Sequence, residues 1–461
     1  MQGIGIDESG RMYDAQLVAN DACYYYLARS GRHIDWPMWW VFENAGKTPS
    51  AADLVRYVTD RAQALEPLRR RIHEVPGGLA HPFWGVDDSP LDDHVTVHAE
   101  SLDWSGCLDR MGGVLEHPLD ARVSAWQLHI FPDVSGIPTL DGPGTVVMIH
   151  VSHALMAGPA MTSLSEALFA PGPPPLRIEG LGPAAHRPPL RRAAVRGALS
   201  WPVQLLRFVI GARAENRRIA REGDEGGPNL TPRSTTVLNR RIGPGRAVRT
   251  FPVDLRTVRA PGTTVTAVGL TAISRAMQRY LDKRGETCPD DLAAFVTIAV
   301  PDAPVMGANR VGADVVDLHP ATPGNDRARA VDTTLRARRG SATSRRELTR
   351  LHLVDQLPAR IYRSAHGTLR PPESAPPTVA HTVLTSIRCE PTAEWTLLDN
   401  PFRFAGMLPP VYPDIALAHS FVGAADTFAV AVVCDPALID DIDDYCDLLQ
   451  ESFAEIAASA E

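Results

Sequence analysis

Residues 148–158, which read MIHVSHALMAG, are the feature that most constrains what this chain can fold into. The apolar run at 145–149 predicts a strand, and 159–169 has the apolar spacing of an amphipathic helix. A turn of small residues that contains His153 joins the two. A histidine that follows a buried strand and opens onto a loop is well placed to present a general base to a pocket. We therefore expect a strand–turn–helix unit that carries a functional histidine.

Composition and proline content predict the organisation of the chain. The 461 residues are 44% hydrophobic and 22% charged, which suits a globular protein of two domains. Seven prolines and three glycines fall within 171–190, where no regular core element is expected. We predict an N-terminal lobe at 1–170, a proline-rich linker with basic amphipathic helices at 171–229, and a C-terminal lobe at 230–461.

Periodic apolar residues predict both helices and strands in each lobe. Helices are expected at 51–72, 263–281 and 438–456, and strands at 127–131, 293–300, 379–387, 415–422 and 427–434.

Residues 191–221 are rich in arginine and interleaved with large apolar residues. Two interpretations stay open. The segment is either a helix packed on the protein with its arginines in solvent, or a patch that contacts a membrane surface or an anionic ligand.

Charge and cysteine usage narrow the class of protein. The formal net charge is −8 with no basic block, which argues against nucleic-acid binding. The six cysteines form no C-x-x-C pair, residues 1–11 are polar, and no apolar run approaches the ~20 residues of a membrane span. These features predict a cytoplasmic protein without a signal peptide or a transmembrane segment. His150 and His153 alone are too weak a pattern to indicate zinc.

The histidine segment resembles H-H-A-x-x-D-G, the active-site motif of the wax ester synthase/diacylglycerol acyltransferase family. That family belongs to the condensation-domain and chloramphenicol-acetyltransferase superfamily. Ser152 occupies the position of the first histidine, His153 that of the second, Ala157 that of the aspartate, and Gly158 is retained. Other landmarks of the family recur in order along nearly the whole chain: 21–26, 91–95, 118–126, 238–251, 264–268, 309–311 and 404–406.

The resemblance implies an α/β fold of two chloramphenicol-acetyltransferase-like lobes with a tunnel between them. It implies that His153 acts as the general base and that no metal or prosthetic group is needed. Ser152, Gly158, Thr266 and Asn309 are the expected substrate-binding residues. The implied co-substrate is an acyl-CoA or acyl-carrier-protein thioester, so a carrier protein is a candidate partner. The family aspartate pairs with an arginine that supports the histidine loop, and Ala157 removes that support.

Two hypotheses for the function follow. The first is an acyltransferase that moves an acyl group from a thioester to a hydroxyl or an amine, in specialised metabolism. The second keeps the tunnel without transfer chemistry: a binding or regulatory homologue, or a condensation-like enzyme that catalyses a cyclisation or a rearrangement. An open cavity beside a free ring nitrogen of His153 would favour the first.

Overall fold

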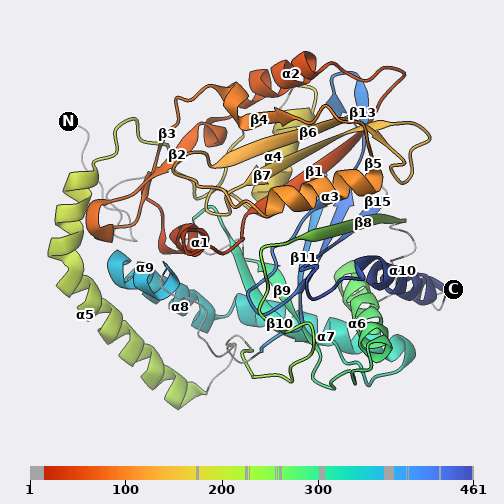
Figure 1. The fold of residues 1–461 in the computed structure, drawn as a ribbon. Coiled ribbons are helices and arrows are strands. Elements are labelled where there is room, and N and C mark those ends of the chain that lie inside the picture. Colours follow the sequence, from red (N-terminus) through yellow and green to blue (C-terminus); the bar gives the residue numbers. More distant parts are fainter. Residues whose placement is uncertain are drawn as a thin grey trace.

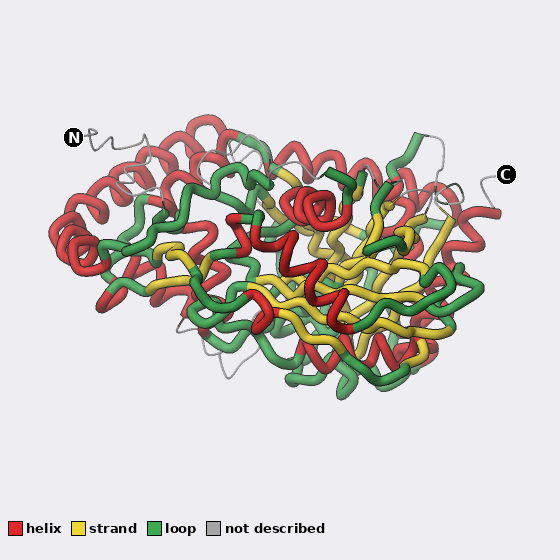
Figure 2. The backbone as a smooth tube through the Cα atoms, turned by 90° about the horizontal axis from the view of Figure 1, so that it is seen from above, coloured by secondary structure: helices red, strands yellow, loops and turns green. Residues whose placement is uncertain are grey.

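The fold was analysed in a computed structural model of the 461-residue chain. The structure describes residues 15–458, apart from 173–175, 224–226, 228, 255, 257, 259–261, 301–306, 368–377, 391, 393 and 425–426. The polar N-terminal segment, 1–11, lies outside the described residues. Strands stack together in the body of the molecule and helices surround them (Figures 1 and 2).

The first sheet has seven strands in the order β12-β13-β1-β7-β6-β4, with β5 added beside β6. These strands are β1 (Trp36–Glu43), β4 (Val95–Val97), β5 (Leu102–Asp103), β6 (Trp126–Ser135), β7 (Gly144–Val151), β12 (Thr396–Leu397) and β13 (Asn400–Met407). The central strand β1 pairs with β7 on one side and with β13 on the other. Two strands from late in the chain therefore complete a sheet that is otherwise built from its first third.

The second sheet has six strands in the order β10-β9-β11-β14-β15-β8. These strands are β8 (Ala247–Asp254), β9 (Ala293–Ala299), β10 (Val311–Asp317), β11 (Thr382–Cys389), β14 (Leu417–Ala424) and β15 (Thr427–Cys434). A separate pair, β2 (Arg70–His73) and β3 (Phe83–Val86), flanks the first sheet.

Helices lie around the two sheets, and some of them pack on other helices at the side of the molecule (Figure 1). They are α1 (Ala19–Arg29), α2 (Ala51–Gln63), α3 (Trp104–Leu115), α4 (Pro159–Phe169), α5 (Leu190–Glu222), α6 (Val265–Lys283), α7 (Gly324–Ala342), α8 (Arg345–Asp355), α9 (Ala359–Gly367) and α10 (Ile442–Ala458), with short 3-10 turns η1 (Glu66–Leu68), η2 (Pro76–Gly78) and η3 (Leu91–His94). In the described part of the chain, no helix combines the length and apolarity needed to cross a bilayer.

Alternating side chains of β1 join the two sheets into one body. Successive residues of a strand point to opposite faces. Trp40 and Phe42 therefore pack in the core under α2 and α4, whereas Trp39 and Val41 enter a second core. This second core also contains Ala429 of β15, so the two sheets pack against each other.

The structure confirms most of the predicted elements. β7 and α4 lie where the histidine segment predicts them, and α6, α10 and strands β9, β11, β14 and β15 lie at the expected positions within a few residues. The helix predicted at 51–72 is wrong beyond Gln63, because Pro67 opens η1 and the chain then becomes β2. The three-part division at 170 and 230 stays a prediction.

Buried histidines make the fold sensitive to acid. In the second sheet, His419 is fully buried between the Thr382 hydroxyl at 2.8 Å and the Tyr445 hydroxyl at 2.7 Å. Burial lowers the pKa of His419 to about 3, and burial likewise lowers the pKa of His81 and of His129 to about 4.

We predict that the protein loses stability as the pH falls from 7 to 5. An unfolded histidine takes up its proton near pH 6.5, whereas these buried rings stay neutral. Their stabilising contribution is complete above pH 6.5 and is lost as the pH falls toward 4. Urea unfolding at the two pH values should show a lower free energy of unfolding at pH 5, by about 2 kcal/mol for one such histidine. His419→Gln should flatten this dependence, and an unchanged slope in that variant would contradict the assignment.

Candidate active site

The turn after β7 is built to hold His153 in place. The backbone N–H of Ser152 donates to the carbonyl of Ala125 at 2.9 Å, and that of Leu155 donates to the carbonyl of Ser152 at 2.8 Å. Gly158 is the N-cap residue of α4 and has φ of 54°, a backbone conformation that favours glycine.

Two aromatic side chains fix the plane of the His153 ring. Tyr24 of α1 stacks on it with a centroid separation of 3.8 Å and an angle of 5° between the planes. Trp36, at the start of β1, lies with its ring centroid 6.3 Å away. The imidazole is thus clamped by residues that come from distant parts of the sequence.

Asn309 is the polar centre of the site, and it is completely buried. Its Nδ2 donates to Asp21 Oδ1 at 2.9 Å and to the His153 carbonyl at 2.7 Å. Asp21 also accepts the backbone N–H groups of Ala308 at 3.0 Å and of Asn309 at 3.1 Å. Because both neighbours of Nδ2 are acceptors, only the NH₂ end of the amide can occupy that position.

The orientation of Asn309 determines which nitrogen of His153 carries the proton. Asn309 Oδ1 lies 3.2 Å from His153 Nδ1 and can only accept, so Nδ1 is the protonated nitrogen of the neutral ring. The other nitrogen, Nε2, then has a free lone pair, and it has no hydrogen-bond partner among the described residues. Burial lowers the pKa of His153 to about 4, so the ring is neutral near pH 7.

A cavity of about 430 Å³ opens beside His153, between α4 with its preceding turn and strands β9, β10 and β11 of the second sheet. Its walls from the first half of the chain include Trp36, Gly158 and Thr162, and those from the second half include Thr297 and Arg388. The volume falls in the range of ordinary small-molecule pockets, roughly 300–1,000 Å³. The arrangement can accept a proton from a molecule held in this cavity.

The predicted site residues do not all share the cavity. His153 and Gly158 line it. Ser152 is buried next to His153, and Asn309 lies behind the histidine, where its observed contacts are to protein groups. Thr266 lies in the first turn of α6 and is not among the residues that line this cavity. The substrate-binding roles of Ser152, Gly158, Thr266 and Asn309 stay predictions.

Asp21, Tyr24 and Trp36 are part of the site, although the sequence did not single them out for it. Asp21 and Tyr24 lie in the first family landmark, so their recurrence was visible but their role was not. Trp36 belongs to β1, a strand without a predicted function.

His150 lies apart from this constellation. Its Nε2 is 3.1 Å from Asp35 Oδ2, and both side chains are buried. Asp35 also accepts the backbone N–H of Leu119 at 2.8 Å. His150 therefore takes part in a buried polar contact. The described residues contain no cluster of three or more side chains suited to hold a metal.

Comparisons with known proteins agree with this architecture. The profile of the wax ester synthase/diacylglycerol acyltransferase catalytic domain matches residues 17–268, and that of the C-terminal domain of the same family matches 308–457. The chain therefore belongs to the wax ester synthase/diacylglycerol acyltransferase family, a class of acyltransferases.

Individual relatives are more distant. A provisionally named diacylglycerol O-acyltransferase of Mycobacterium tuberculosis is 26% identical over 265 residues, 53% of this chain and 54% of that protein. The chain thus matches about half the length of this curated relative.

Solved structures resemble the fold over nearly the whole chain. The wax ester synthase/diacylglycerol acyltransferase of Marinobacter aquaeolei VT8 has a TM-score of 0.63 at 15% identity, covering 96% of this chain and 99% of that one. A mutant starter condensation domain of rhizomide synthetase, in complex with C8-CoA and Leu-SNAC, has a TM-score of 0.53 at 11% identity, covering 97% and 94%. The two-lobed α/β fold of the chloramphenicol-acetyltransferase type is thereby confirmed.

We predict that Asn309→Ala changes the tautomer of His153. Without the Oδ1 acceptor, the proton is no longer held on Nδ1, and the fraction with the proton on Nε2 should rise. The variant also loses the amide that donates a hydrogen bond to Asp21. This loss should lower the free energy of unfolding by about 1–3 kcal/mol. Nitrogen NMR of labelled histidine measures the first effect and urea unfolding measures the second.

Asn239→Ala is the matched control for this variant. Asn239 is a buried asparagine whose Nδ2 donates to the carbonyls of Ala380 at 3.0 Å and Asp414 at 3.2 Å. Its loss should lower stability without changing the His153 tautomer. Equal tautomer populations in the Asn309 variant and the parent would refute the positioning role.

We also predict that Ala157→Asp lowers the melting temperature. Ala157 is buried with Leu155, Met156 and Met161 in an apolar core cluster, so a carboxylate there would be desolvated. Ala157→Asn, of nearly equal size and neutral, separates the effect of charge from that of volume. A higher melting temperature for the aspartate than for the asparagine would show that an arginine partner is still within reach.

Proposed function

We propose that this protein transfers an acyl group from a CoA or acyl-carrier-protein thioester to a hydroxyl or an amine, with His153 as the general base. The observation that carries the proposal is the neutral His153 ring, which lines a cavity of about 430 Å³ and whose Nε2 has no hydrogen-bond partner among the described residues. Membership of an acyltransferase family supports the same chemistry.

Each chemical step can be written for the residues present. The acceptor O–H or N–H gives its proton to His153 Nε2 as the acceptor atom attacks the thioester carbonyl. The Nδ1–H bond to Asn309 Oδ1 keeps the ring in place while it becomes positively charged. The tetrahedral intermediate then expels the thiolate, which takes the proton from Nε2. The products are an ester or amide and a free thiol, and no serine or cysteine nucleophile takes part.

The substituted motif favours a specialised acceptor over standard wax-ester or triacylglycerol synthesis. Ser152 and Ala157 alter the wall next to His153, and Ala157 lines the cavity itself. We place the reaction in specialised metabolism and in the cytoplasm, where the six free cysteines would stay reduced.

A binding protein or a condensation-like enzyme that catalyses cyclisation or rearrangement is the alternative. A histidine that lines an open cavity and has an unpartnered Nε2 among the described residues favours transfer over binding alone. The deciding experiment incubates the purified protein with a panel of acyl-CoA thioesters and alcohol or amine acceptors, with mass spectrometry of products. Acylated acceptor together with free CoA supports the proposal. Rearranged substrate, or tight binding without turnover, would replace it.

We predict that His153→Ala lowers kcat by ~10²–10⁴-fold, because a positioned base contributes that much to proton transfer. The activity of the parent should be constant near pH 7 and fall as the pH drops through about 4, where the base becomes protonated. A brief assay after a pH jump separates the loss of activity caused by protonation of His153 from the loss caused by acid unfolding.

His117→Ala is the matched control for the catalytic variant. The side chain of His117 is exposed, and its one hydrogen bond among the described residues is from Nδ1 to the carbonyl of Gly113 at 3.1 Å. The kcat of the His117→Ala variant should equal that of the parent. If the His153 variant also retains the rate of the parent, the base is another group.

A further inference from the structure

Helix α5 (Leu190–Glu222) is 33 residues long, yet only Ala193 and Ala194 are buried in it. It runs along one outer edge of the molecule, beside α8 and α9 (Figure 1). At 1.5 Å per residue it extends for about 50 Å. A helix of this length that buries so little gains little stability from packing on the body.

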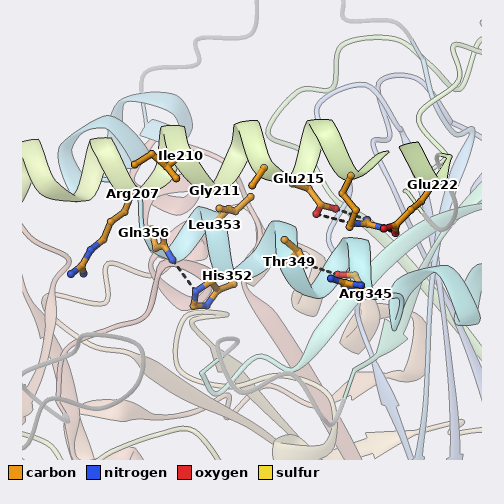
Figure 3. A pocket seen from close by; sticks show the side chains of 12 residues that line it. Arg207, Ile210, Gly211, Glu215, Glu222, Arg345, Thr349, His352, Leu353 and Gln356 are labelled. Atoms are coloured by element: carbon orange, nitrogen blue, oxygen red, sulfur yellow. Dashed lines mark hydrogen bonds and ion pairs between the residues drawn. The ribbon is translucent and has the colours of Figure 1, made fainter. Parts of the chain in front are cut away.

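Two glycines mark where α5 touches the rest of the protein. A Cβ at Gly197 would lie 2.0 Å from the Leu79 carbonyl oxygen, and one at Gly211 would lie 2.4 Å from Leu353 Cδ2. Leu353 of α8 packs against Gly211, and both residues line a groove of about 630 Å³ between the two helices (Figure 3). The two glycines are fourteen residues apart, close to four full turns, so they lie on one side of the helix.

The side of α5 away from these two glycines carries large apolar side chains, of which Ile210 also borders the groove to α8. Its large apolar side chains are strongly exposed: Val195 at 61%, Leu199 at 75%, Val203 at 51%, Leu206 at 58% and Ile210 at 57%. They recur at spacings of three and four residues, which forms a continuous stripe. We call these five residues the apolar stripe. Trp201, 43% exposed, and Leu205, 39% exposed, lie outside the stripe on the same helix.

Positive charge surrounds the apolar stripe. The helix holds eight arginines and two glutamates, in a chain whose formal net charge is −8. Arg191 and Arg192 precede the stripe, and Arg213 and Arg217 follow it; all four are exposed. An apolar face with large side chains, bounded by arginines, is the pattern of a helix that lies in the interface of a membrane.

We propose that the apolar stripe of α5 docks on an anionic lipid bilayer, with the stripe at the level of the acyl boundary and the flanking arginines among the lipid phosphates. Charge complementarity selects this occupant, because the positive helix belongs to a negative protein. The inference is independent of the proposed acyl transfer.

Sedimentation with lipid vesicles tests the proposal on the full-length protein. Vesicles of phosphatidylcholine mixed with phosphatidylglycerol should bind it, vesicles of phosphatidylcholine alone should bind it less, and salt should weaken the binding. The double variant Leu199→Glu/Leu206→Glu should bind anionic vesicles about tenfold less or weaker still. Arg213→Gln/Arg217→Gln should lose about tenfold on anionic vesicles and little on neutral ones.

Val123→Glu is the matched control, since Val123 is an apolar residue 70% exposed outside α5. This control should bind vesicles as the parent does. Circular dichroism and thermal melts should show that all variants are folded, and turnover of soluble substrates without lipid should be unchanged in the α5 variants.

Three results would overturn the proposal. One is no binding of the parent to anionic vesicles. Another is equal binding by the Leu199/Leu206 double variant. The third is a dimer of the parent, seen by light scattering, that this double variant abolishes while vesicle binding is absent, which would assign the stripe to a second copy of the chain.

Discussion

The carboxamide of Asn309 is the interaction on which the site depends. It connects Asp21 near the start of the chain with His153 in its first half, and it belongs to the second half itself. Its two N–H groups satisfy the carboxylate and the histidine carbonyl, which leaves its oxygen to hold the ring proton. Removing any of the three groups leaves a buried polar partner unmet, at a cost of about 1–3 kcal/mol. The orientation of the catalytic candidate is thus tied to the association of the two halves of the chain.

The contacts around Asn309 explain how the histidine loop is held although its motif is altered. In the family pattern an aspartate supports the histidine loop, and here Ala157 occupies that position in apolar surroundings. The loop is held by Gly158, by the backbone contacts of Ser152 and by Asn309. Stacking of Tyr24 on the ring adds a further restraint. A neutral histidine with a free Nε2 therefore exists in this chain without the charged support.

The local apolar pattern of the sequence predicted the helices and strands well. It did not predict which residues from distant parts of the chain come together. The strand before His153 and the helix after it follow from apolar periodicity, since both patterns are complete within a few residues. The helix predicted at 51–72 stops early because Pro67 outweighs the apolar spacing. The partners of His153 could not be derived from spacing, because Asp21 and Asn309 lie 132 and 156 residues away from it along the chain. The resemblance to a family indicated these positions without indicating what they contact.

The pairing of β1 with β13 has a consequence for how the protein acquires its structure. Residues 36–43 and 400–407 are hydrogen-bonded neighbours, so the chain must close a loop of more than 350 residues to form this ladder. Until β13 is made, β1 presents an unpaired edge that contains Trp36, Trp39 and Trp40. Exposed apolar strand edges recruit other chains, and contacts between distant residues form slowly. During synthesis, the interval between these two strands is therefore the period in which the chain is most exposed to aggregation, and a chaperone that shields the β1 edge would act in that interval.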